Sequence, residues 1–130
     1  MKIILEPAEC EQFFYDSLCN GLYELQCYGI AVKTTEKAYT SAKKRLKKAK
    51  PNEVICYEDV LMEILRGGDV LKFVDEEGFE DPIEVTLAMV HERMNDVPLK
   101  WIMQKIERND DAITADVILQ TIAFGEIVYG

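Results

Sequence analysis

Residues 114–124 read Thr-Ala-Asp-Val-Ile-Leu-Gln-Thr-Ile-Ala-Phe, and Gly125 follows them. On a helix built from this stretch, apolar side chains occur around most of the circumference, at Val117, Ile118, Leu119, Ile122 and Phe124. A helix that is apolar on nearly every side must also be covered on nearly every side. We therefore expect this segment, capped at its start by Thr114, to run through the middle of the core.

Five further helices are expected around it, because apolar residues recur at helical spacing along the chain. They cover residues 7–27, 34–50 and 58–66, and two later stretches lined by Leu87, Val90 and Met94 and by Leu99, Ile102, Met103 and Ile106. Pro7 suits a first helical turn, Thr34 suits the N-cap of the second helix, and Pro51 prevents that helix from continuing. Gly21 lies in the apolar stripe of the first helix, where it predicts either a bend or the close approach of another element.

Two β-branched or aromatic runs, residues 70–74 and 83–86, flank an acidic segment and predict a β-hairpin with an acidic tip. Shorter strand candidates are residues 2–5, 54–57 and 127–129, of which the first and the last would pair with each other.

These patterns together predict the fold class. We expect an α+β fold in which residues 1–130 form a single, mostly helical domain with about six helices. The hairpin lies near residues 70–86, and short terminal strands accompany it.

The length and composition set the broad class of protein. The chain has 130 residues, of which 48% are hydrophobic and 30% are charged, as in an ordinary globular domain. No apolar stretch approaches the roughly 18 to 20 residues of a membrane span, and the short apolar run before Glu6 does not resemble a signal peptide. We therefore expect a cytoplasmic protein with no membrane partner.

Charge is segregated along the sequence. The formal net charge is −9, but residues 33–50 sum to +7, residues 1–32 to −4 and residues 51–130 to −12. The overall acidic balance disfavours non-specific attraction to nucleic acid, whereas a local basic patch still acts within a Debye length of roughly 8 Å. The sequence predicts one basic helix beside an acidic body.

The cysteines and the histidine give no metal signature. Cysteines occur at positions 10, 19, 27 and 56 without a C-x-x-C pair, and the one histidine, His91, is far from all of them in the sequence. A structural zinc site usually draws its ligands from tightly spaced pairs. We expect no metal site and no cofactor, and we expect reduced thiols that fill the core.

Motifs with known catalytic mechanics are missing from the sequence. It contains no G-x-x-x-x-G-K-[ST], G-x-G-x-x-G, G-x-S-x-G or H-E-x-x-H pattern. His91 falls on or beside the buried stripe of its helix, and Asp111 belongs to a cluster that suits helix capping better than calcium binding. We predict that the protein is not an enzyme, and we identify no small-molecule substrate.

The order of a basic helix, a second helix and a hairpin invites comparison with a winged helix that reads DNA. The segment that would enter the groove carries Glu58, Asp59 and Glu63, and the hairpin that would be the wing is acidic, so phosphates would repel both. Nucleic-acid contact through residues 33–50 alone stays an alternative, as does an acidic body that imitates DNA.

The leading hypothesis is a small, non-catalytic protein-interaction or accessory protein, of the kind that viruses and mobile elements encode. Its expected partner is another protein or a second copy of the chain. Trp101 is placed beside the buried stripe of its helix and suits an interface anchor, and packing over the edge of the core is the alternative. The residues expected to bind the partner are Lys43, Lys44, Arg45, Lys47, Lys48, Trp101, Glu76, Glu77 and Phe79.

Overall fold

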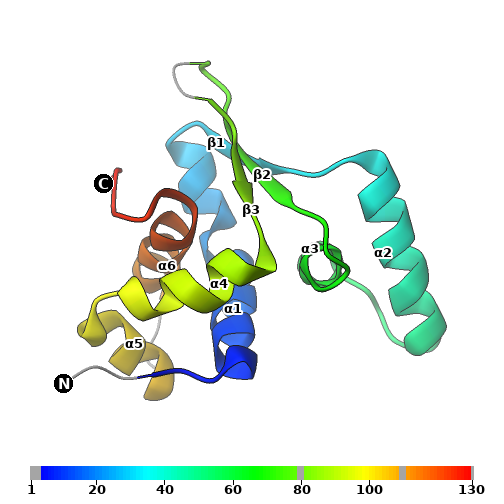
Figure 1. Ribbon diagram of the computed structural model, residues 1–130, viewed down its shortest axis with the longest axis horizontal. Coiled ribbons are helices and arrows are strands. Elements are labelled where there is room, and N and C mark those ends of the chain that lie inside the picture. Colours follow the sequence, from blue (N-terminus) through cyan, green and yellow to red (C-terminus); the bar gives the residue numbers. More distant parts are fainter. Residues whose placement is uncertain (1–3, 79–80, 109–110, 130) are drawn as a thin grey trace.

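The computed structural model describes residues 4–78, 81–108 and 111–129. Its elements, in chain order, are α1 (Pro7–Cys27), β1 (Ile30–Lys33), α2 (Glu36–Ala49), α3 (Tyr57–Arg66), β2 (Leu71–Asp75), β3 (Ile83–Val85), α4 (Leu87–Arg93), the 3-10 helix η1 (Met94–Asp96), α5 (Leu99–Ile106) and α6 (Ala112–Phe124). Figure 1 shows a small sheet among the helices, with α2 at one end of the molecule and α5 at the other. The expected mostly helical α+β fold is confirmed.

The central helix is α6, as its apolar circumference predicts. Every residue from Thr114 to Ala123 is buried, and α1 packs along it. Where the two helices meet, a Cβ on Gly21 would lie 2.9 Å from Cδ1 of Leu119 and 3.0 Å from Cβ of Ala115. Gly21 therefore marks a close approach, which is one of the two roles predicted for it.

Two helices begin with a different cap from the one expected. The side chain of Thr35, rather than Thr34, accepts from the backbone N–H of Ala38 in the first turn of α2, at 3.1 Å. At the start of α6 the carboxylate of Asp111 accepts from the backbone N–H of Thr114, so Thr114 is not the N-cap. In each case two residues close to the start of the helix carry an oxygen that could cap it, and the sequence alone does not say which one does.

The sheet has three antiparallel strands in the order β1-β2-β3. The predicted hairpin is confirmed, with Leu71 opposite Val85 and Phe73 opposite Ile83. The third strand is β1, which places Ile30 opposite Asp75. This strand was not expected, because it has four residues and forms only by pairing with a distant segment.

The other strand predictions are wrong for the residues that the structure describes. Residues 4–5, 54–56 and 127–129 belong to no strand, and Val54 is 95% exposed. The C-terminal segment is instead held by a buried side chain. Oε1 of Gln120 accepts from the backbone N–H groups of Val128 and Tyr129, each at 2.8 Å, and its Nε2 donates to the Tyr129 carbonyl at 3.1 Å. These bonds replace the strand pairing that we expected.

The cysteines are free, as expected, but only Cys10 is buried. Cys19, Cys27 and Cys56 are exposed, so the prediction that the thiols fill the core is wrong for these three. They occupy the solvent side of α1 and the loop before α3, which the apolar stripes alone do not distinguish from the core edge.

Candidate functional site

Helix α2 lies at the edge of the fold and packs mainly against α3 (Figure 1). It buries only Ala38 and Ala42, while Tyr39 and Leu46 are half-buried against the core. Because the buried side is narrow and made largely of small side chains, most of the circumference of α2 faces solvent.

The outer side of α2 carries a row of lysines. Lys37, Lys44 and Lys48 are separated by seven and four residues, which places them on one face of a helix. Lys47 lies beside them, and all four side chains are exposed. Among the described residues, no carboxylate forms an ion pair with any of these four lysines. We call Lys37, Lys44, Lys47 and Lys48 the lysine face.

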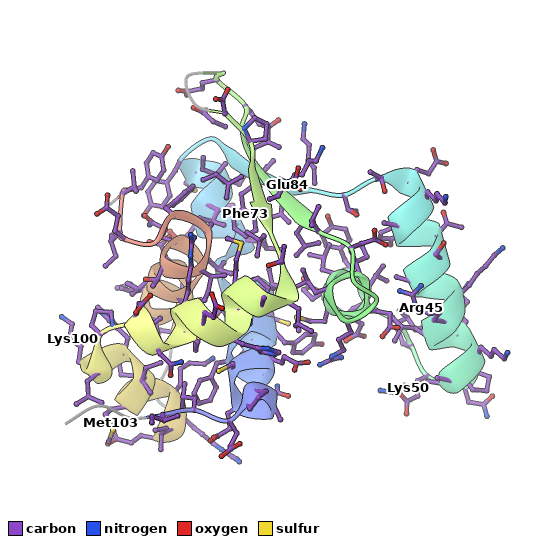
Figure 2. The ribbon with its side chains drawn as sticks, viewed as in Figure 1. Arg45, Lys50, Phe73, Glu84, Lys100 and Met103 are labelled. Carbon is purple, nitrogen blue, oxygen red and sulfur yellow. The ribbon has the colours of Figure 1, made fainter. Side chains whose placement is uncertain are left out.

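Arg45 does not belong to the lysine face. It is turned toward α3, where its Nε donates to Oε1 of Glu63 at 2.9 Å and its Nη2 donates to the Glu63 backbone carbonyl at 3.3 Å (Figure 2). A Cβ on Gly67 would overlap the guanidinium group, so the end of α3 is shaped around it. Arg45, which we expected to bind a partner, joins α2 to α3 instead. Lys43 is half-buried on the other flank of α2.

The acidic tip of the hairpin lies apart from α2 (Figure 1). Glu76 and Glu77 are exposed, and Oδ1 of Asp75 accepts from the backbone N–H of Glu77 at 2.9 Å. Phe79, also expected to bind a partner, lies outside the described residues. The structure therefore does not bring the lysine face and the hairpin tip into one binding surface.

Trp101 is half-buried and packs against the core. The ammonium group of Lys100 lies 4.7 Å from the centroid of its ring, in a cation–π contact. We expected Trp101 beside a buried apolar stripe of α5, but most of the residues of that stripe are exposed. Of the four apolar residues expected to line the buried face of α5, only Ile102 is buried, whereas Leu99, Met103 and Ile106 are exposed.

His91 lies at the core edge and joins three helices. Its Nε2 lies 3.0 Å from Oε2 of Glu11 on α1, whose Oε1 accepts from Nε of Arg66 on α3 at 2.9 Å. Partial burial alone would raise the pKa of Glu11, but the hydrogen bonds from Arg66 and His91 outweigh it and lower that pKa below its ordinary 4.5. The thiol of Cys10 contacts the His91 backbone carbonyl rather than its ring. This arrangement is a structural clamp and not a Cys–His nucleophile pair.

A second titratable cluster caps α3. The hydroxyl of Tyr15 donates to Oδ1 of Asp59 at 2.8 Å, and Oδ2 of Asp59 accepts from the backbone N–H of Cys56 at 3.1 Å. Burial would raise the pKa of Asp59, but the hydrogen bonds from Cys56 and Tyr15 lower it below its ordinary 3.8. One carboxylate oxygen of Asp59 thus caps the start of α3, and the other fixes α3 to Tyr15 of α1.

A cavity of about 550 Å³ lies between the sheet, the end of α6 and the C-terminal segment. Its walls combine apolar and charged side chains, with Phe73, Phe124 and Tyr129 on one hand and Asp75 and Arg93 on the other. Nη1 of Arg93 already donates to the carbonyls of Ile122 and Ala123, at the C-terminal end of α6. The described residues include no group of three or more histidine, cysteine or acidic side chains that could hold a metal ion.

No protein-family model, curated protein or solved structure matches the chain. In the part of the chain that is described, no helix has both the length and the apolar character needed to cross a membrane.

Proposed function

We propose that the protein is a non-catalytic accessory protein that binds an acidic surface of a partner protein through the lysine face of α2. The observation that supports this best is the exposure of four lysines on one side of a helix, with no carboxylate of the described residues neutralising them. From Lys37 to Lys48 the row spans about 16 Å at 1.5 Å per residue, which is three turns of helix.

The residues around the lysine face favour a protein over a nucleic acid. Specific recognition of nucleic acid relies on guanidinium forks and on aromatic rings that stack on bases. The one arginine of α2, Arg45, is engaged with Glu63. The ring of Tyr39 packs against that of Tyr57, with 6.1 Å between their centroids. The rest of the chain is strongly acidic, with −4 before residue 33 and −12 after residue 50. A carboxylate-rich partner meets the lysines without needing either feature, and its association should be salt-sensitive.

The test uses zero-length carbodiimide cross-linking in a nuclease-treated extract of cells that express the gene. This chemistry couples a lysine amine directly to a carboxylate in ion-pair contact. We expect cross-links from Lys44, Lys47 or Lys48 to aspartate or glutamate residues of one partner protein. The variant Lys44→Gln with Lys48→Gln should lose that partner and keep its stability within about 0.5 kcal/mol, because both side chains are exposed.

The matched control is Lys33→Gln with Lys72→Gln. It removes the same formal charge from two exposed lysines that lie opposite each other in β1 and β2. This control should retain the partner, which separates an effect of α2 from an effect of net charge. The proposal is overturned if both double variants lose the partner equally. It is also overturned if the unmodified protein binds duplex or single-stranded nucleic acid tightly near physiological salt.

A further inference from the structure

Helix α5 is turned so that Lys105 faces the core beside Ile102, while three of its apolar residues face solvent. Lys105 is 5% exposed, while Leu99 and Ile106 are each 48% exposed and Met103 is 37% exposed. An amphipathic helix on a protein surface ordinarily buries its apolar stripe and leaves its charged residues in water. Of the residues in the apolar stripe, Ile102 alone, on one flank, is buried.

Specific contacts hold α5 in this rotation. Nζ of Lys105 lies 3.5 Å from Oδ2 of Asp16 on α1 and 5.8 Å from the centroid of the Phe13 ring. On the same side of α5, Gln104 accepts a hydrogen bond from the hydroxyl of Thr114 on α6. A rotation that buried Leu99 and Met103 would break these contacts and expose the lysine. The contacts of Lys105 and Gln104 therefore keep the apolar stripe exposed to solvent.

The outward residues form one continuous stripe. Leu99, Met103 and Ile106 are spaced by four and three residues, so they lie on adjacent turns of the same helix face. Figure 2 shows Lys100 and Met103 on α5 at the outer corner of the molecule, away from α2. Two exposed side chains of opposite charge, Lys100 and Glu107, lie along one flank of the stripe, two turns apart.

We propose that a second copy of this chain covers the stripe, with the two α5 helices packed antiparallel about a twofold axis near Met103. In such a pair the same flank of each helix meets its copy, and residues at nearly equal distances on either side of Met103 lie beside each other. Leu99 then lies against Ile106 of the partner subunit, and Met103 lies against Met103 of the partner subunit. Lys100 comes beside Glu107 of the partner subunit, and the symmetry repeats this ion pair.

The charge pattern is what selects a second copy as the occupant. The stripe is complementary to a second copy of itself in its apolar residues and in its charges, because both are arranged almost symmetrically about Met103. The contact is independent of the lysine face, which lies at the far end of the molecule. It also has its own salt dependence. Each copy carries −9, so the copies repel at low salt, and an apolar contact persists when salt screens that repulsion.

The first test measures molar mass by sedimentation equilibrium over a range of protein concentrations, at physiological and at high salt. We expect a reversible dimer that persists at high salt. Met103→Lys should weaken it by about tenfold or more, because it places two ammonium groups at the twofold axis. The control is Val54→Lys, which introduces the same lysine at an apolar residue that is 95% exposed outside α5, and it should leave dimerisation unchanged.

A charge exchange tests the antiparallel register. Lys100→Glu and Glu107→Lys should each weaken the dimer, and the double variant should restore it, because the pair is re-formed with its signs exchanged. A protein that is monomeric at every concentration overturns the proposal. So does a dimer that dissolves at high salt, resists Met103→Lys, or fails to recover in the double variant. The circular dichroism spectrum of each variant establishes that the fold is retained.

Discussion

Arg45 of α2 and Glu63 of α3 form a two-point contact, in which the guanidinium group reaches both the carboxylate, at 2.9 Å, and the backbone carbonyl, at 3.3 Å. Arg45 is one of six basic residues between positions 43 and 50, and its side chain holds two helices together. The contact matters because α2 buries little else than two alanines.

Replacing Arg45 should therefore destabilise the protein, whereas replacing its lysine neighbour should not. We expect Arg45→Gln to lower the free energy of unfolding by about 1 kcal/mol, since it removes a charge-assisted contact to a half-buried carboxylate. Lys44→Gln, which removes the same charge one residue earlier, should change it by less than about 0.5 kcal/mol. Urea denaturation followed by circular dichroism measures both values. Equal effects would show that Arg45 is no more than another surface cation.

Gln120 is expected to hold the C-terminal segment in place. Gln120→Leu removes the acceptor for the backbone N–H groups of Val128 and Tyr129, and it should cost about 2 kcal/mol of stability. Amide hydrogen exchange at these two residues should accelerate sharply. The control is Thr121→Val in the same buried helix, whose hydroxyl bonds only within α6, to the Val117 carbonyl. It should leave exchange at residues 128 and 129 unchanged.

The clamp around Glu11 predicts an acid-dependent loss of stability. Because Arg66 and His91 lower the pKa of Glu11 in the folded protein, the unfolded chain binds the proton at a higher pH than the folded one. The stabilising contribution is complete above the ordinary value of 4.5 and is lost as the pH falls through the lowered folded pKa. Glu11→Gln should flatten this part of the profile of unfolding free energy against pH. Glu92→Gln, an exposed carboxylate on α4, should leave the profile unchanged.

The thiols should titrate in two classes. Cys19, Cys27 and Cys56 are exposed and should react with a disulfide reagent in the native protein, whereas Cys10 should react only after unfolding. Burial raises the pKa of both Cys10 and Cys19, so Cys19 should react slowly at neutral pH and faster as the pH rises. Cys10→Ala should reduce the total after unfolding by one and leave the native count unchanged. Native reaction of all four thiols would contradict the buried position of Cys10.

Much of the fold is decided locally and can be predicted from the sequence. The apolar circumference of α6, the stripe of α1 and the hairpin each follow from a pattern within one segment, because periodicity reports which faces must leave water. The lysine face follows only in part. The sequence predicts an exposed basic helix, because lysines rarely leave water, but it does not predict that Arg45 turns toward α3 or that Lys37 belongs to the face. The sequence also predicts a bend or a close approach at Gly21, but it does not identify Ala115 and Leu119 as the residues that approach.

Tertiary structure decided the features that depend on contacts between distant segments. Strand β1 exists only because residues 30–33 meet residues 72–75, and the C-terminal segment is irregular because a buried glutamine supplies its hydrogen bonds. The rotation of α5 could not be read from its own sequence, because its apolar stripe predicts the opposite orientation. What turns it is the pairing of Lys105 with Asp16, which lies on another helix 89 positions earlier in the chain. A pattern within one helix records which residues prefer to leave water, but only the partners brought by the fold determine which of those preferences are met.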